Sequence, residues 1–147
     1  LKDCRVNVNS DPAGQEGGRD VRGVTAGDEG VDTLRGICKE HGLSCEYKQQ
    51  VWSSDSNSFA MAGIPALTYD RDGYGMHTKE DTLDRISPIA LEDACTLIGT
   101  IAEDLSCRDF FPIPRTIPKT LQEELHRYFA ARNSYDLQVT KERNERS

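Results

Sequence analysis

The alternation of strand patterns with helix patterns constrains the fold of this chain more than any other feature. Strand patterns occupy residues 4–11, 43–51 and 64–70, and helix patterns occupy residues 28–41, 53–63 and 88–107. The last helix pattern is the clearest, because its apolar residues recur at helical spacing: Ala94, Leu97, Ile98, Ile101 and Leu105. Strands that alternate with helices favour an α/β fold, in which helices cover a layered sheet.

Start and stop signals support these helices. Ser87 is a good N-cap, and Pro88 suits the first position of the helix that follows it. Gly42 and Gly63 are well placed to end the two earlier helices. The glycine-rich residues 14–19 follow the first strand and predict a mobile loop.

The C-terminal part of the chain departs from this pattern and gives the domain boundaries. We assign residues 1–109 to the α/β unit, residues 110–133 to a proline-rich connection and C-terminal helix, and residues 134–147 to a polar, frayed tail. With only about three strands, the sheet is expected to be incomplete. The chain begins at Leu1 and not at a methionine, which indicates processing or a piece of a longer protein.

Composition excludes several classes of partner. The net charge of -7 argues against nucleic acid and against an anionic membrane surface, because both bind clustered positive charge. No apolar run approaches the roughly 20 residues that span a bilayer. The five cysteines form no Cys-x-x-Cys pair, which disfavours a cysteine-only zinc site, and their odd number favours a reducing, cytoplasmic location.

His77 is the first candidate for a functional residue. It follows Gly73 and Gly75, and glycines let a loop backbone approach a metal ion or a substrate closely. Neutral imidazole is a common zinc ligand. The residues alone leave a second interpretation open, a surface histidine in the turn before the next helix. The other two histidines, His41 and His126, lie on predicted helices and are not expected to be ligands.

Three further candidates lie near predicted strand ends or loops. Asp11 ends the first strand, where a carboxylate is held rigidly enough to bind a metal ion, although Asp-Pro is also a common turn opener. Asp55 is interpreted as a pocket residue or as the cap of the short helix. Tyr74 is interpreted as a contact to a substrate carbonyl or as a packing residue. Trp52 is expected in the core or in a pocket wall.

The stretch SSDSNSFAMAGIPALTYDRDGYGMHTKEDTLDRISPIAL, residues 53–91, resembles the C-terminal half of the catalytic domain in the zinc-dependent aminopeptidase family. This is the group of co-catalytic di-zinc exopeptidases that includes aminopeptidase S and glutamate carboxypeptidase II. The matching positions are Ser54, Asp55, Phe59, residues 62–66, His77, Thr78, Asp81 and Thr82. The resemblance covers roughly residues 4–106 and implies a three-layer zinc-exopeptidase-like (phosphorylase/hydrolase-like) sheet between helices.

The resemblance also implies a metal site. In the family, the histidine before the threonine binds one zinc ion, which corresponds to His77. An aspartate after an upstream strand binds the other zinc ion, and the sequence Asn9-Ser10-Asp11 matches that shape. Two zinc ions are therefore expected in the complete site, although an Asp and His set alone also suits cobalt or manganese.

The chain departs from the family pattern in two ways. Many members place an aromatic residue directly before the zinc histidine, where this chain has Met76, so Tyr74 is the substitute or the role is unfilled. The family also needs a His-x-Asp ligand element and a Glu-Glu pair upstream of Asp11. The chain has no His-x-Asp, and the one adjacent acidic pair before His77, Asp28-Glu29, follows Asp11 instead of preceding it. It therefore resembles half of an active site.

Two functional hypotheses follow from the residues and the resemblance. The first is a segment of a metal-dependent exopeptidase, which hydrolyses peptides from their amino end with a zinc-activated water and needs an N-terminal half or a partner chain. The second is a non-catalytic binding or regulatory module. Self-association of the chain, which would duplicate Asp11 and His77, is a further possibility because an incomplete sheet leaves apolar edges exposed.

Overall fold

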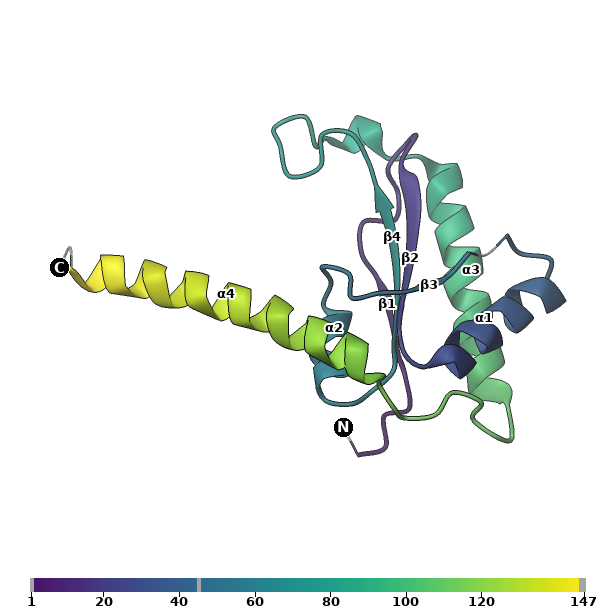
Figure 1. Ribbon diagram of the computed structural model, residues 1–147. Helices are drawn as coiled ribbons and strands as arrows, with labels where there is room; N and C mark the ends of the chain where they lie inside the picture. The colour runs from purple at the N-terminus through teal and green to yellow at the C-terminus, as the bar shows by residue number, and fades with distance from the viewer. Residues whose placement is uncertain (1, 45, 146–147) are drawn as a thin grey trace.

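The computed structural model describes residues 2–44 and 46–145, and for residue 19 and residues 133–145 it describes the backbone alone. Its strands are β1 (Asn7–Ser10), β2 (Arg19–Thr25), β3 (Lys48–Gln49) and β4 (Ala66–Asp72). Its helices are α1 (Asp28–Glu40), α2 (Ser56–Met61), the short 3-10 helix η1 (Leu83–Arg85), α3 (Pro88–Cys107) and α4 (Lys119–Glu145) (Figure 1).

The strands form one mixed sheet in the order β1-β4-β2-β3. β1 is parallel to β4, β4 is antiparallel to β2, and β2 is parallel to β3. Because β1 and β4 are parallel, their carboxyl ends lie at the same edge of the sheet. The beginning of β2 lies at that edge too, since Arg19 pairs with Asp72.

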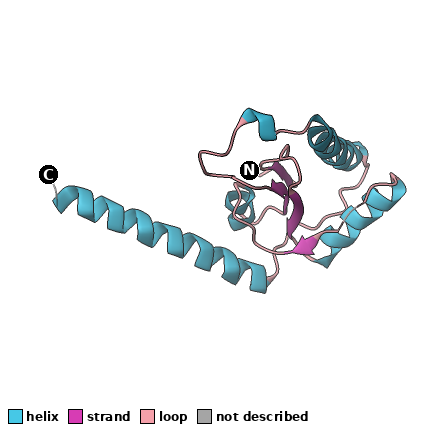
Figure 2. Ribbon diagram, turned by 90° about the horizontal axis from the view of Figure 1, so that it is seen from above, coloured by secondary structure: helices cyan, strands magenta, loops and turns pink. Residues whose placement is uncertain are grey.

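Helices cover both faces of the sheet, which confirms the expected layered α/β fold (Figures 1 and 2). One face packs against α1 and α3 through a buried apolar cluster that includes Val24, Leu34, Leu67, Tyr69 and Ile101. The other face packs against α2 and α4 through a smaller cluster: Ala60, Ala66, Ile117, Leu121 and Leu125. The proline-rich connection therefore crosses from one layer to the other, because Ile113 belongs to the first cluster and Ile117 to the second.

The sheet differs from the expected one in two strands. β2 was not expected, and it follows directly after the glycine-rich loop, where charged side chains conceal the strand pattern. The strand expected over residues 43–51 is reduced to β3, because residues 43–44 and 46–47 bring the chain from the α1 layer back to the sheet. Cys45 lies outside the described residues.

The expected helix boundaries agree closely with the structure. The Ser87 side chain accepts a hydrogen bond from the Ala90 N–H at 3.3 Å, and Pro88 opens α3. Gly42 and Gly63 follow α1 and α2 with positive φ angles of 67° and 75°. α4 continues through residues 134–145, where a frayed tail was expected, because that stretch contains neither glycine nor proline to end it.

No helix in the described part of the chain is long and apolar enough to cross a membrane.

Candidate functional site

The carboxyl ends of β1 and β4 bring two aspartates side by side at one edge of the sheet. Ser10 lies opposite Tyr69 in the parallel ladder, and the Asp11 N–H donates to the Tyr69 carbonyl at 2.9 Å. The next rung, from the Arg71 N–H to the Pro12 carbonyl, is 2.7 Å long. Asp11 and Asp70 therefore occupy neighbouring positions on the same sheet face, because side chains alternate along a strand.

Asp11 is held through one of its two carboxylate oxygens. The Asn9 side-chain amide donates to Asp11 Oδ1 at 3.0 Å and lies 3.3 Å from Ser54 Oγ. Ser54 Oγ in turn lies 3.1 Å from Thr68 Oγ1, so this polar network crosses from β1 to β4. Asp11 Oδ2 is buried and has no hydrogen-bond partner among the residues that the structure describes.

Asp70 is held in the same manner, and the sequence reasoning did not select it. The Trp52 indole N–H donates to Asp70 Oδ2 at 2.7 Å, while Asp70 Oδ1 is buried without a hydrogen-bond partner in the described part of the chain. Only 4% of Asp70 is exposed. Burial raises the pKa of the Asp70 carboxyl above its ordinary value of 3.8, the Trp52 N–H lowers it, and the nearby Asp11 charge raises it again. An aspartate at the end of an apolar strand, like Asp11, was the available signal.

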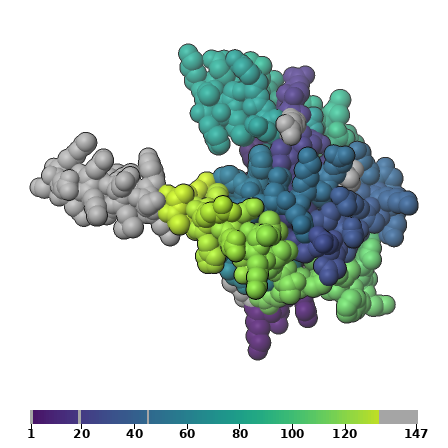
Figure 3. All heavy atoms as spheres, viewed as in Figure 1, coloured from purple at the N-terminus to yellow at the C-terminus, as the bar shows by residue number. Residues whose placement is uncertain are grey.

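His77 lies on the loop between β4 and η1, which stands out from the body at the same edge (Figures 1 and 3). Its φ angle is 64°, a left-handed conformation that is uncommon outside glycine. The turn around it is closed by Thr78, whose N–H and hydroxyl both donate to the Gly75 carbonyl, at 3.0 Å and 2.6 Å. His77 is exposed.

The glycine-rich loop after β1 is held against the segment that follows His77. The Glu16 N–H donates to the Arg85 carbonyl at 2.8 Å, and the Ser87 N–H donates to the Gly14 carbonyl at 2.8 Å. The Gln15 side-chain amide lies 3.4 Å from Asp81 Oδ1. The loop expected to be mobile thus ties the β1 end of the sheet to the loop that carries His77.

Of the remaining candidates, Trp52 contacts this carboxylate pair, whereas no hydrogen bond or ion pair among the described residues joins Asp55 or Tyr74 to it. Asp55 occupies the N-cap position of α2 but makes no capping hydrogen bond, and the Ser56 N–H instead donates to Ser54 Oγ at 3.1 Å. Tyr74 is 77% exposed and faces the Arg85 guanidinium, 5.7 Å from its ring centre. Trp52 is half-buried and serves as the donor to Asp70.

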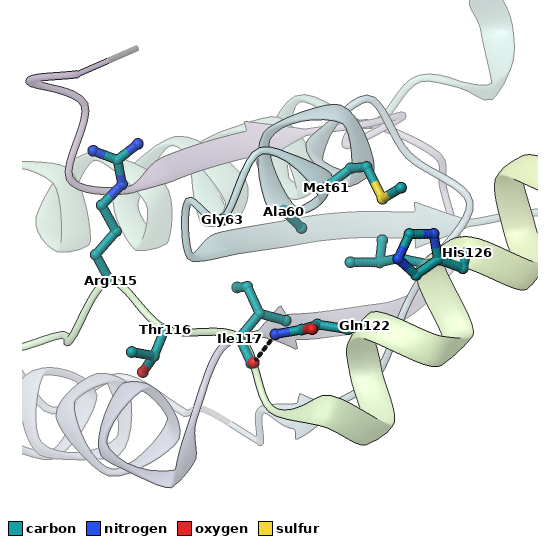
Figure 4. Close-up of a pocket in the computed structure, with 9 residues that line it drawn as sticks. Ala60, Met61, Gly63, Arg115, Thr116, Ile117, Gln122 and His126 are labelled. Atoms are coloured by element: carbon teal, nitrogen blue, oxygen red, sulfur yellow. Dashed lines mark hydrogen bonds between the residues drawn. The ribbon is translucent and has the colours of Figure 1, made fainter.

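The other two histidines also lie away from the sheet edge. His41 ends α1, with Nε2 3.5 Å from Asp104 Oδ2. His126 lines a cleft of about 410 Å³ between α2, α4 and the proline-rich connection (Figure 4). That cleft includes Gly63, which precedes β4, so it lies at the opposite end of β4 from Asp70.

The structure brings Asp11 and Asp70 together but completes no metal site. Among the residues that it describes, no group of three or more His, Cys, Asp or Glu side chains could hold a metal ion. Asp11 and His77, the two ligands implied by the resemblance, therefore share one edge of the sheet, and the described residues form no complete set of ligands around them.

Comparison with known proteins gives the chain a family. The model of peptidase family M28 matches residues 1–102. The chain belongs to peptidase family M28. This confirms the resemblance to zinc-dependent aminopeptidases, which rested on residues within the same range.

Solved structures agree with this assignment. Two structures of BSAP, a zinc aminopeptidase from Bacillus subtilis, match this M28 chain with TM-scores of 0.58 and 0.59 at 22% sequence identity. The matches cover 80% and 76% of this chain but only 32% and 31% of BSAP, so the chain spans about a third of the length of that enzyme. The likeness shows a common fold, with this chain as a part of it. A comparison with curated proteins found no match.

Proposed function

We propose that this M28 chain is a segment of a metal-dependent exopeptidase of the aminopeptidase type and that it supplies Asp11 and His77 to the metal site. Membership of the family supports a metallopeptidase, and the likeness to BSAP supports zinc as the metal. Because the chain spans about a third of BSAP, the remaining ligands and the general base would come from an N-terminal part or from a partner chain.

One observation carries this proposal: the buried, unpaired Oδ2 of Asp11 at the edge that also bears the His77 loop. An ionised carboxylate oxygen removed from water needs a hydrogen-bond donor or a cation, and this one has neither among the described residues. The donor set therefore fits part of a cation site. It does not fit a complete one, since zinc takes about four ligands.

The roles that we assign to these residues follow from the hydrogen bonds that hold them in place. Asn9 fixes one oxygen of Asp11 and so aims the other, while the Gly75–Thr78 turn fixes the backbone of His77. A bound zinc pair would supply an activated water, because a metal ion lowers the pKa of the water that it binds towards neutrality. We assign substrate contacts to Tyr74, which is exposed on the loop that carries His77, and to Asp55, which is exposed at the N-cap position of α2.

Several finer expectations form part of the same proposal. The peptide substrate would bind between this chain and its complement, and residues 1–109 would be the peptidase part, followed by the connection and helix over residues 110–133. Two zinc ions would occupy the completed site. A cytoplasmic location remains the expectation from the odd number of cysteines.

The test is hydrolysis of a set of aminoacyl p-nitroanilides, with added zinc, by the protein encoded in the full reading frame that contains residues 1–147. We expect His77→Ala and Asp11→Asn to lower kcat/KM at least about 100-fold, since even the outer-shell partners of metal ligands contribute about 10- to 100-fold. His126→Ala is the matched control and should leave kcat/KM unchanged, because His126 lines the distant cleft.

Two results would count against this function. Full activity in His77→Ala would show that the loop histidine is not a metal ligand. Absence of hydrolysis by every form, together with measurable binding of unmodified peptides, would support the alternative of a non-catalytic binding or regulatory module.

A further inference from the structure

Asp11 and Asp70 form a carboxylate pair, and in each carboxylate one oxygen accepts a side-chain hydrogen bond while the other accepts none from the described residues. Asn9 holds Asp11 Oδ1 at 3.0 Å, and Trp52 holds Asp70 Oδ2 at 2.7 Å. The other two oxygens, Asp11 Oδ2 and Asp70 Oδ1, are both buried, and neither has a hydrogen-bond partner among the described residues. The two strands thus present two free carboxylate oxygens from adjacent positions on one sheet face.

The cationic side chains of the neighbouring strands do not neutralise this pair. Arg71 follows Asp70 and points to the opposite face, where its guanidinium binds Asp20 at 2.8 Å. Arg22 also binds Asp20, at 2.9 Å. In the described part of the chain, neither Asp11 nor Asp70 takes part in an ion pair. Two carboxylates at neighbouring positions of the ladder, with no counter-charge among the described residues, disfavour the metal-free fold.

We propose that Asp70 is a second metal-binding carboxylate, which faces the same divalent cation as Asp11. This inference rests on the proposed function, and it changes the ligand count there: the ion at Asp11 receives two ligands from this chain and not one. Carboxylate oxygens are suitable ligands for zinc, and also for manganese. Trp52 is the positioning residue of the pair, because its hydrogen bond holds Asp70 Oδ2 and leaves Oδ1 for the ion.

Trp52 also makes the inference measurable without any assay of activity. It is the single tryptophan of the chain, and it touches the proposed ligand directly. Titration of the purified 147-residue chain with zinc chloride, followed by tryptophan emission and by isothermal calorimetry, therefore reports binding at this pair. Thermal unfolding with EDTA and with zinc gives a second measurement, since a cation that binds only the folded state raises Tm.

Three variants distinguish direct binding of zinc by a carboxylate from a general attraction of the cation to negative charge. Asp70→Asn and Asp11→Asn each remove one ligand oxygen and should weaken zinc binding by about 10-fold or more. Asp72→Asn is the matched control, because Asp72 is an exposed aspartate two residues further along the same strand. It should change the affinity by less than about 2-fold. In EDTA, Asp70→Asn should unfold at a temperature no lower than the unaltered chain, because it removes an uncompensated buried charge.

The outcomes distinguish this inference from the function on which it rests. Zinc binding that is weakened by Asp11→Asn and unaffected by Asp70→Asn would overturn the role of Asp70 and leave the proposed function standing. A loss of Tm in EDTA for Asp70→Asn, with unchanged zinc affinity, would show a purely structural residue. Absence of saturable zinc binding by the unaltered chain would overturn the inference too, while the activity of the His77→Ala protein decides the function separately.

Discussion

The indole ring of Trp52 has one N–H group, which donates a hydrogen bond to the buried carboxylate of Asp70. Trp52→Phe keeps most of the ring but leaves Asp70 with both oxygens unpaired. Hydrogen bonds to charged groups contribute about 1.5–3 kcal/mol, so we expect a loss of about 2 kcal/mol in the free energy of unfolding. Urea denaturation followed by circular dichroism measures this loss.

A double-mutant cycle assigns that loss to the hydrogen bond. In an Asp70→Asn background the acceptor is neutral, so Trp52→Phe should cost less than in the unaltered chain. An equal cost in both backgrounds would mean that Trp52 stabilises the fold through packing and not through Asp70.

The contribution of Asp104 to the free energy of unfolding is expected to depend on pH. Arg108 Nε donates to the Asp104 carboxylate at 2.5 Å, His41 Nε2 lies 3.5 Å away, and Arg108 also approaches Glu40 at 3.7 Å. The hydrogen bond from Arg108 lowers the pKa of the Asp104 carboxyl below its ordinary value of 3.8. The contribution is therefore present at pH 7 and is lost as the pH falls through the lowered pKa of the folded protein.

The check is the urea midpoint of Asp104→Asn against the unaltered chain at pH 7 and at pH 3. We expect a lower midpoint for the variant at pH 7 and a smaller difference at pH 3. Asp109→Asn, which changes an exposed aspartate, is the control and should show little difference at either pH. The same difference at both pH values would contradict the assignment.

Sequence reasoning selected Asp11 and His77 because each stands in a recognisable local setting, a strand end and a glycine loop. Asp70 also ends an apolar strand pattern, but nothing in the local sequence links it to Asp11. It gains meaning only when β4 pairs with β1, and this pairing joins residues far apart in the chain, which no local periodicity reveals. The hydrogen bond from Trp52 to Asp70 could not be predicted for the same reason, because it joins residues from different segments of the chain.

At the scale of single elements, the start of α3 is stabilised by its N-cap residue, Ser87, which the sequence predicts. Ser87 Oγ accepts the Ala90 N–H, one of the four N–H groups that a helix start leaves without an intrahelical partner. Ser87→Ala should lower the free energy of unfolding by about 1 kcal/mol. Thermal and urea unfolding give the value.

Ser106→Ala is the control for this cap. Ser106 is an exposed residue of the same helix and donates only to the Ala102 carbonyl. Its replacement should change stability by less than about 0.5 kcal/mol. Equal losses for the two serines would show that Ser87 acts as a surface residue and not as a cap.

β2 shows where element prediction from sequence fails. Its residues RDVRGVT lack the clean alternation of an exposed strand, because the charged side chains of Asp20 and Arg22 belong to an ion-pair network with Arg71. The strand exists because all seven residues pair with β4. Helices α1 and α3 were predictable since their apolar spacing and end signals are local, whereas β2 is defined by its partner.

At the scale of the whole molecule, two apolar clusters on opposite faces of one sheet hold the layers together. The cluster under α1 and α3 lies on the face of Tyr69 and the Asp20 network, and the cluster under α2 and α4 lies on the face of Asp11 and Asp70. The second face therefore carries both the carboxylate pair and the attachment of α4. The first part of α4 packs against the body, and the helix then extends away from it (Figures 1 and 2).

Replacing Leu125 tests how much the packing of α4 on the sheet contributes to stability. Leu125 is 1% exposed and packs in the cluster with Ala60, Ala66 and Leu121. Leu125→Ala should cost about 2–4 kcal/mol, because it removes buried methyl groups and leaves a cavity between α4 and α2. Leu83→Ala, at a leucine that is 86% exposed, should change stability by less than about 0.5 kcal/mol. Urea denaturation gives both values, and limited proteolysis should cut α4 faster in Leu125→Ala than in Leu83→Ala. Equal stability of the two variants would mean that α4 lies against the body without contributing to its fold.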